Sequence, residues 1–372
     1  MVKTQTPRGI GPGGVRYDIA QIISEGERKM KKVLVILLSL VMIFTFAACG
    51  GSGSSGGGDE ASGETYELRL ATHYNTEHAG YAAIEKAVAA IEEQTGGAVK
   101  ISVYPSSQLG DYTVTYQDLG SGAVDLALIP CPSEYDPRIE MNFVPYMFSD
   151  YSQLAKAFGP DSYFFENYVP IHAEQGVEYM GAYVEGLIGI GFTTLPDGYG
   201  DPNVKKNLKI RCPAIEVYNL VTEDLGFNAV TIPYADLYTS MQTGVCDGWI
   251  GGTPQLNYSD FKDIIKYYVP YNVFAENIGF FMSAKTAEKL PAEYADIIRD
   301  VFAQASLESF ETAEALDAEA LQGLKDYGVE IVELTDEEMA ACVKKVQEVT
   351  WPKLYANIGE DVLKGLVEAL NS

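Results

Sequence analysis

The fold class is decided by residues 208–248, which read LKIRCPAIEVYNLVTEDLGFNAVTIPYADLYTSMQTGVCDG. In the middle of this stretch apolar residues recur at helical spacing, and the pattern ends at Gly226. These residues are Val217, Leu220, Val221 and Leu225. The pattern predicts strands at 208–211, 229–233 and 246–250, with helices at 217–225 and 235–243 between them. Strands joined by single helices form a parallel sheet, and such sheets bind ligands beyond the carboxyl ends of their strands.

Arg211 lies at the carboxyl end of the first predicted strand, just before Pro213 interrupts the pairing. Its guanidinium group offers a planar fork of donors that matches a carboxylate. An arginine alone at this place is equally compatible with a structural salt bridge at the surface. The residues around it decide between the two interpretations.

Those residues resemble the signature of the solute-binding proteins of TRAP transporters, the DctP-like family. The shared features are LKIR followed by Pro213, then Ile232-Pro233, Leu237-Tyr238 and the TGVCDG turn of residues 243–248. The resemblance covers roughly residues 64–354. It implies an α/β, two-lobed periplasmic-binding-protein-like fold with a long bracing helix. In this family the arginine of the strand binds the carboxylate of the ligand, which implies that role for Arg211.

The amino-terminal residues predict export and anchoring rather than a folded domain. Residues 1–29 lack apolar periodicity and read as an over-extended start, whereas residues 30–48 have the basic head, apolar run and small residues of a lipoprotein signal peptide. Cys49 follows in a context that resembles a lipobox, so we expect it to be lipidated, with residues 49–63 forming a flexible Gly/Ser tether. A transmembrane anchor is the alternative, but the apolar run is shorter than the ~20 residues of a span.

The rest of the chain predicts two lobes. We assign residues 64–184 and 273–316 to lobe I, and residues 185–272 and 317–372 with the carboxy-terminal helices to lobe II. A helix is predicted from Pro291 to about Tyr327, long enough to brace both lobes. Thr335 and Glu338 are spaced as a capping box that begins a further helix.

Candidate ligand contacts follow from the resemblance and from their places at strand ends. They are Arg211, Trp249, Tyr234, Tyr238, His73, Tyr74, Gln108 and Glu185; for all but Arg211, packing or capping is an alternative role. The chain also departs from the family pattern, since no arginine lies between Arg138 and Arg211, and Gly251 stands where a ligand-contacting Asn is expected. These departures favour a small or more apolar carboxylate over a large polyhydroxylated acid.

Composition excludes several classes of function. A net charge of −26 opposes binding to nucleic acid or to anionic lipid surfaces. We find no GxSxG elbow, HExxH motif or phosphate loop, so we expect neither an enzyme nor a cofactor. His73 and His78 lack the spacing of helical metal ligands, and we expect no metal site.

We therefore expect a monomeric extracytoplasmic receptor on the outer face of the cytoplasmic membrane, which delivers a carboxylate to TRAP membrane subunits. A lipoprotein of the same fold that senses a ligand without transport is the alternative. Cys212 and Cys246 follow neighbouring strands and can form a disulfide, although buried free thiols are the favoured interpretation for this sparse pattern.

Overall fold

The computed structural model describes residues 9–10, 16–17, 64–147 and 150–371. The chain divides into two compact units, Met1–Ser62 and Gly63–Ser372. In the first unit, β1 (Gly9–Ile10) and β2 (Arg16–Tyr17) form an antiparallel pair. The predicted signal peptide, the lipidated Cys49 and the tether lie outside the described residues. No helix among the described residues is long and apolar enough to cross a membrane.

Lobe I is built on a five-stranded sheet with the order β4-β3-β5-β12-β6. The strands are β3 (Tyr66–Thr72), β4 (Val99–Tyr104), β5 (Leu126–Ile129), β6 (Val177–Leu187) and β12 (Ala275–Ser283). The first three run parallel, whereas β12 is antiparallel to both of its neighbours. Every residue of β5 and β12 is buried, and the sequence of β5 is correspondingly apolar throughout.

Lobe II is built on a six-stranded sheet with the order β13-β11-β7-β10-β8-β9. The strands are β7 (Gly189–Phe192), β8 (Lys209–Cys212), β9 (Asn228–Thr231), β10 (Gly248–Gly252), β11 (Tyr267–Val269) and β13 (Glu330–Ile331). As predicted, β9, β8 and β10 are parallel and alternate with α6 (Glu216–Asp224) and α7 (Tyr234–Gln242). The sheet is nevertheless mixed, because β7 is antiparallel to β10 and β11.

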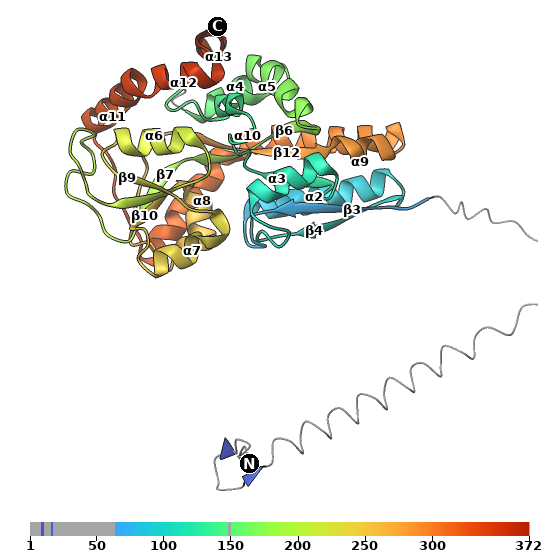
Figure 1. The fold of residues 1–372 in the computed structure, drawn as a ribbon, viewed down its shortest axis with the longest axis horizontal. Coiled ribbons are helices and arrows are strands. Elements are labelled where there is room, and N and C mark those ends of the chain that lie inside the picture. Colours follow the sequence, from blue (N-terminus) through green and yellow to red (C-terminus); the bar gives the residue numbers. More distant parts are fainter. Residues whose placement is uncertain (1–8, 11–15, 18–63, 148–149, 372) are drawn as a thin grey trace, which may run out of the picture. The chain divides into compact units, whose positions relative to one another are not determined.

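Three segments join the lobes (Figure 1). Strand β6 continues through Ile188 into β7, and β11 leads back into β12. The third segment is α10 (Ala292–Tyr327), a helix of 36 residues that packs on β6 and α2 (Ala79–Gln94) of lobe I and on α8 (Pro254–Leu256) and β13 of lobe II. The predicted fold, with its long bracing helix, is confirmed.

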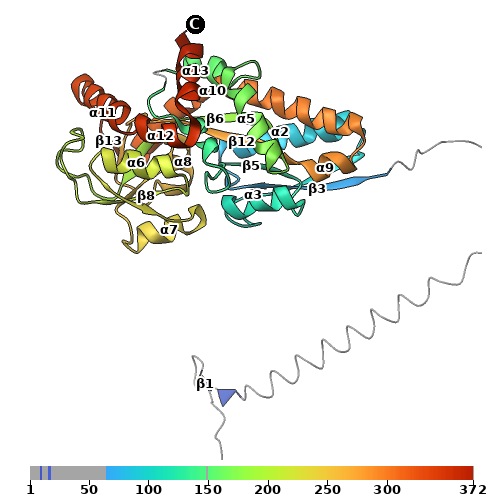
Figure 2. The same ribbon diagram turned by 45° about the horizontal axis from the view of Figure 1, so that its top comes forward.

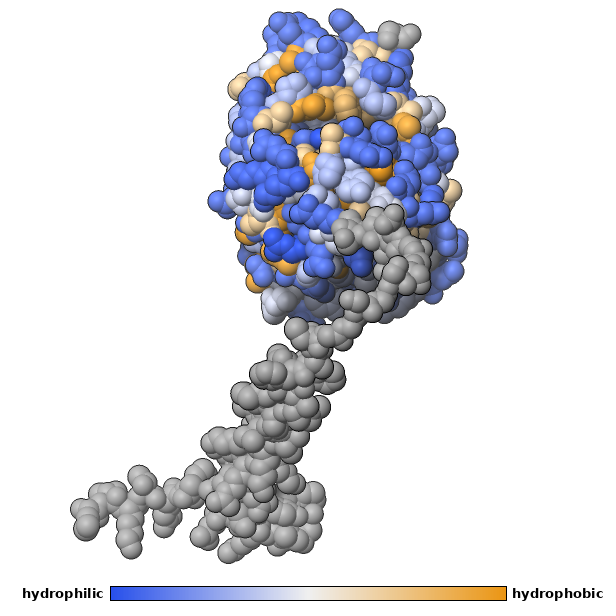
Figure 3. Space-filling model, turned by 90° about the vertical axis from the view of Figure 1, so that its right-hand side faces the viewer, coloured by the Kyte–Doolittle hydropathy of each residue, from blue (hydrophilic) through white to orange (hydrophobic). Residues whose placement is uncertain are grey.

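The remaining helices cover the sheets (Figures 1 and 2). They are α3 (Tyr112–Ser121), η1 (Pro137–Phe143), η2 (Tyr151–Gln153), α4 (Leu154–Phe158), α5 (Tyr163–Glu174), η3 (Asn257–Phe261), α9 (Ala284–Lys289), α11 (Asp336–Val349), α12 (Trp351–Ile358) and α13 (Glu360–Asn371). The predicted capping box of Thr335 and Glu338 begins α11. Helix α11 packs on α6, whereas α12 and α13 pack on η1, α4 and α5. Figure 3 shows a mainly hydrophilic face with scattered apolar patches.

Candidate functional site

Arg211 is a buried cation whose hydrogen-bonding capacity is only partly used. The residue lies in β8 with 2% of its surface exposed. Its Nε donates to the backbone carbonyl of Ile232 at 2.8 Å. Its Nη2 is buried and has no hydrogen-bond partner among the described residues. Because burying an unsatisfied donor of a charged group is costly, this guanidinium group is suited to receive an anion.

The sheet register places this side chain. Arg211 lies between Val230 of β9 and Trp249 of β10 in the parallel ladder. Gly251 has a φ of +118°, and a Cβ added to it would lie 3.5 Å from Nη1 of Arg211. The ring of Tyr234 lies 5.8 Å from Cζ, within the range of a cation–π contact. The missing side chain at Gly251 thus leaves space beside the guanidinium group.

Arg211 lines a narrow pocket between the lobes, which we call the inner pocket. Its wall consists of His73, Tyr112, Pro130, Arg211, Pro213, Ile215, Tyr218, Tyr234, Gly251, Leu256 and Glu276. Its volume is about 20 Å³, which is enough for about one water molecule. His73 and Tyr234 also line an adjoining outer hollow of about 320 Å³. The lobes are therefore closed around the arginine, with wider space outside it.

Hydrogen bonds across the lobes hold this closed arrangement at the outer hollow. Asn75, which follows β3 in lobe I, donates its side-chain amide to Asp260 in lobe II. The hydroxyl of Tyr234 donates to the other carboxyl oxygen of Asp260 at 2.6 Å. Burial raises the pKa of Asp260 above its ordinary value. Both Asn75 and Asp260 line the outer hollow, so opening the lobes breaks contacts at its wall.

Helix α3 makes two further contacts across the pocket. The backbone N–H of Ala214 donates to the hydroxyl oxygen of Tyr112 at 2.7 Å. The backbone N–H of Ala235 donates to Asp111 at 3.3 Å. Asp111 also caps α3 by accepting from Thr113. The start of α3 therefore contacts both the segment after β8 and the start of α7 in this closed arrangement.

The electrostatics of the inner pocket leave Arg211 as its one cationic side chain among the described residues. Burial lowers the pKa of His73 to about 3, so its imidazole is neutral at physiological pH. Burial, together with the charge of Glu185, raises the pKa of Glu276 well above its ordinary value. Although burial opposes its ionisation, His78 and the hydrogen bonds from Thr253 and Tyr74 hold the pKa of Glu185 below its ordinary value.

The structure brings three of the predicted contact residues together at the inner pocket: Arg211, Tyr234 and His73. Tyr238 lines the outer hollow, where it is 38% exposed and donates to Asp263 at 2.7 Å. Sequence position at strand ends was a useful guide for these residues, because the ends of neighbouring strands meet at the cleft.

The other four predicted residues do not line either space. Tyr74 and Glu185 are buried and joined by a hydrogen bond of 2.8 Å. Trp249 is buried, donates to Oδ1 of Asn257 at 3.0 Å and packs on Phe261. Gln108 is exposed in the segment after β4. In this closed arrangement Tyr74, Glu185 and Trp249 make contacts inside the protein, whereas Gln108 lies at its surface.

Among the lining residues of the inner pocket with hydrogen-bonding side chains, sequence reasoning missed three: Tyr112, Tyr218 and Glu276. Glu276 carried a signal, since it is an acid within the otherwise mainly apolar run of residues 273–282. The two tyrosines carried none in a chain with 25 of them.

The structure also decides between a disulfide and free thiols for the cysteines. Cys131, Cys212, Cys246 and Cys342 are all buried free thiols. The favoured interpretation of the cysteine pattern is therefore confirmed.

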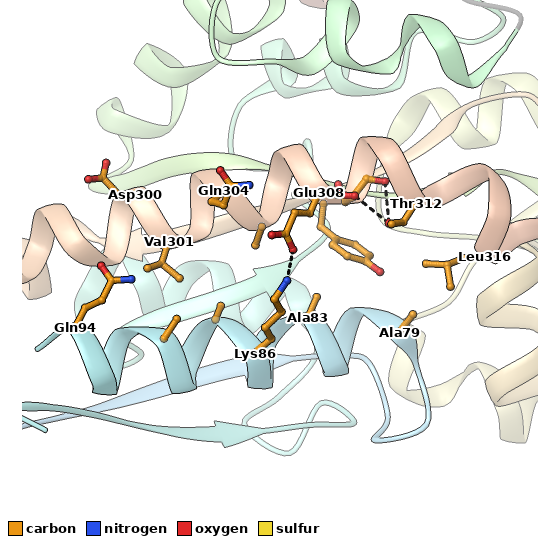
Figure 4. Close-up of a pocket in the computed structure, with 15 residues that line it drawn as sticks. Ala79, Ala83, Lys86, Gln94, Asp300, Val301, Gln304, Glu308, Thr312 and Leu316 are labelled. Atoms are coloured by element: carbon orange, nitrogen blue, oxygen red, sulfur yellow. Dashed lines mark hydrogen bonds and ion pairs between the residues drawn. The ribbon is translucent and has the colours of Figure 1, made fainter. Parts of the chain in front are cut away.

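A second cavity, of about 340 Å³, lies between α2 and α10 (Figure 4). Small side chains such as Ala83 and Ala87 leave this space, and an ion pair of 2.6 Å between Lys86 and Glu308 spans it. Both partners of that pair are largely exposed, and they satisfy each other. The inner pocket, with its buried and unsatisfied guanidinium group, is the stronger candidate for a polar ligand.

Comparison with known proteins identifies the family of the chain. Residues 70–357 match the model of the DctP family, described as bacterial extracellular solute-binding protein, family 7. The chain is 25% identical over 269 residues to the C4-dicarboxylate-binding periplasmic protein DctP of Rhodobacter capsulatus, covering 67% of this chain and 75% of that protein. It is 23% identical over 278 residues to the sialic acid-binding periplasmic protein SiaP of Vibrio cholerae, covering 74% and 84%.

Solved structures share the fold. A TRAP periplasmic solute-binding protein of Shewanella oneidensis with bound succinate superposes with a TM-score of 0.75 at 21% identity, covering 82% of this chain and 99% of that one. The sugar acid binding protein of Advenella mimigardefordensis in complex with galactonate gives a TM-score of 0.77 at 19% identity, covering 83% and 99%. The resemblance inferred from residues 208–248 is confirmed, and the chain belongs to family 7 of the bacterial extracellular solute-binding proteins, the DctP family.

Proposed function

We propose that this protein is the receptor of a TRAP-type secondary transporter, which captures a small organic acid through Arg211 and delivers it to the small and large membrane subunits. The observation that carries the proposal is the buried guanidinium group of Arg211, whose Nη2 lacks a partner at a pocket between two lobes. A ligand carboxylate would supply the missing acceptors in a bidentate, charge-assisted contact. Relatives and structural neighbours named for C4-dicarboxylate, succinate and galactonate support an acid as the ligand.

Capture is proposed to proceed by a hinge motion. Residues 64–184 with 273–316 would move against residues 185–272, since the chain crosses between the sheets at few places. Helices α12 and α13 pack on η1, α4 and α5, so they would move with the first of these bodies. The contacts of Asp260 and Tyr112 across the lobes would form on closure and stabilise it together with the bound acid. A monomer anchored outside the membrane through lipidated Cys49 would suit delivery to a membrane partner.

A ligand screen by thermal shift tests this proposal. Purified protein is heated with a panel of mono- and dicarboxylates, and with neutral sugars and cationic amines as controls, because a ligand of the native state raises the unfolding midpoint. We expect stabilisation by an acid and its loss in Arg211→Ala. Calorimetry should then show an affinity at least ~100-fold weaker, since removing one partner of a buried ion pair costs about 3 to 5 kcal/mol.

The matched control is Arg69→Ala in lobe I, whose side chain is 47% exposed. Its affinity should equal that of the unmodified protein. Stabilisation by neutral or cationic compounds, untouched by Arg211→Ala, would refute the role of this arginine. An acid bound equally well by Arg211→Ala would do the same.

A further inference from the structure

Glu276 is a second buried polar group of the inner pocket. It lies in β12 opposite Gly186 of β6 and is 4% exposed. The hydroxyl of Tyr218 donates to its Oε2 at 3.0 Å. Among the described residues, no hydrogen bond reaches its Oε1. One side of this carboxyl group is thus satisfied by the protein, and the other side is not.

Glu276 and Arg211 do not satisfy each other, although both line the same small pocket. The ion pairs of the described part of the chain include none between them, and Nη2 of Arg211 has no partner. Two groups of opposite chemistry with unused hydrogen-bonding capacity could both be served by one ligand. Such a ligand has an anionic group for the arginine and a hydrogen-bond donor for the carboxyl group.

We propose that Glu276 and Tyr218 form a second subsite in the ligand-bound state, in which the inner pocket is wider than the space for one water molecule seen here. The proposed ligand is a small zwitterionic acid whose carboxylate lies on Arg211 and whose ammonium group lies on Glu276. This inference rests on the proposed function. An ammonium group is favoured over a hydroxyl group because it neutralises a buried carboxylate as well as donating to it. The same wall holds Tyr112 and Tyr234, and aromatic rings can also contact a cation.

The groups around Glu276 influence its protonation, so binding of a ligand at this subsite should change the number of protons bound to the protein. Several ionisable groups act on Glu276 or are affected by its charge. They are Arg211 of β8, Glu185 of β6, Tyr218 of α6, Tyr112 of α3 and Tyr74 after β3. Burial and the charge of Glu185 favour its protonated form in the free protein. A ligand ammonium group favours the carboxylate, so its binding would release the proton of Glu276 to solvent while the ammonium group keeps its own protons. A plain carboxylate has no such effect.

Calorimetry on matched acids tests the second subsite. The probes are β-alanine against propionate and glutamate against glutarate, which differ by the amino group alone. Each is titrated in two buffers of different ionisation enthalpy, with wild type, Glu276→Gln and Tyr218→Phe. We expect the amino acid of at least one pair to bind wild type ~30-fold or more tightly than its partner, with net proton release, because a buried charge pair distinguishes ligands on this scale. Glu276→Gln should abolish that preference.

The two variants separate the possible failures. Tyr218→Phe removes the hydrogen bond to Glu276 and should reduce the preference for the amino acid in part. If Glu276→Gln does not fold, proton release on binding to wild type decides whether the second subsite exists. Plain acids that bind wild type as tightly as the amino acids, with no proton release, would overturn the second subsite and leave the proposed function intact. Binding by either class that Arg211→Ala does not weaken would instead overturn the proposed function.

Discussion

Asp317 offers a test of how the long helix is tied to the segment between the lobes. This residue of α10 is 3% exposed and accepts hydrogen bonds from the backbone of Leu187, at 2.9 Å, and from the hydroxyl of Tyr151. Gly186 lies directly over it, because an added Cβ there would come within 2.4 Å of both carboxyl oxygens. Burial raises the pKa of Asp317 from 3.8 to about 8. The substitution Asp317→Asn keeps the shape and removes the titration.

The sign and size of the effect follow from this pKa. Between pH 3.8 and about 8 the native state holds a proton at Asp317 that the unfolded chain has lost. The free energy of unfolding therefore falls as the pH rises, by about 1.4 kcal/mol per pH unit. From pH 5 to pH 8 the loss amounts to about 3 to 4 kcal/mol, allowing for half-titration at the upper end. Asn at this position has no such dependence.

Urea unfolding at pH 5 and pH 8 measures the effect. The difference in free energy of unfolding between Asp317→Asn and wild type should shift by about 3 to 4 kcal/mol in favour of the variant at pH 8. Asp300→Asn is the control, since this aspartate lies on the same helix and is exposed. A difference that stays constant within ~1 kcal/mol between the two pH values would show that Asp317 is ionised in the native protein.

Three further predictions follow from the contacts. Alkylation without reductant should modify the four cysteines after Cys49 in denatured protein and few of them in native protein, because they are buried free thiols; fewer than four in the denatured chain would reveal a disulfide. Tyr112→Phe removes the hydroxyl that accepts the hydrogen bond from the backbone of Ala214. It should weaken ligand binding about 5-fold, since a lost hydrogen bond of the closed state costs about 1 kcal/mol. Unchanged affinity by calorimetry would mean that closure does not depend on this hydrogen bond. Trp249→Phe leaves Oδ1 of Asn257 unpaired and should lower the free energy of unfolding by about 1 to 3 kcal/mol in urea, and an unchanged midpoint would contradict the assignment of Trp249 to the core.

Much of the architecture was predictable because local periodicity and capping specify it. The alternating pattern of residues 208–248 predicted three parallel strands and two helices, each within about two residues of its observed ends. The long apolar repeat predicted α10, and the pair Thr335 and Glu338 predicted the start of α11. The antiparallel pairing of β12 was not predictable, because it depends on contacts between residues far apart in the sequence.

The site was predictable in part for the same reason. Arg211 was identified from a local motif, and Tyr234 and His73 follow strands that end at the cleft. Glu276 lies 65 positions from Arg211 in the sequence, and only the return of the chain from β11 to β12 in lobe I brings it into the pocket. Trp249 was expected near the ligand from its neighbours in sequence. It lies beside Arg211 in the parallel ladder, but its indole is buried against Phe261 and donates to Asn257, so it is not part of the pocket wall.

The most direct test of the receptor account is a crystal structure of the protein with the acid selected by the thermal-shift screen. The account predicts a carboxylate between the lobes, with its oxygens about 2.7 to 2.9 Å from the guanidinium nitrogens of Arg211, and with Tyr112 and Tyr234 against the ligand. A carboxylate bound elsewhere, such as in the cavity between α2 and α10, with Nη2 of Arg211 still without an acceptor, would contradict it.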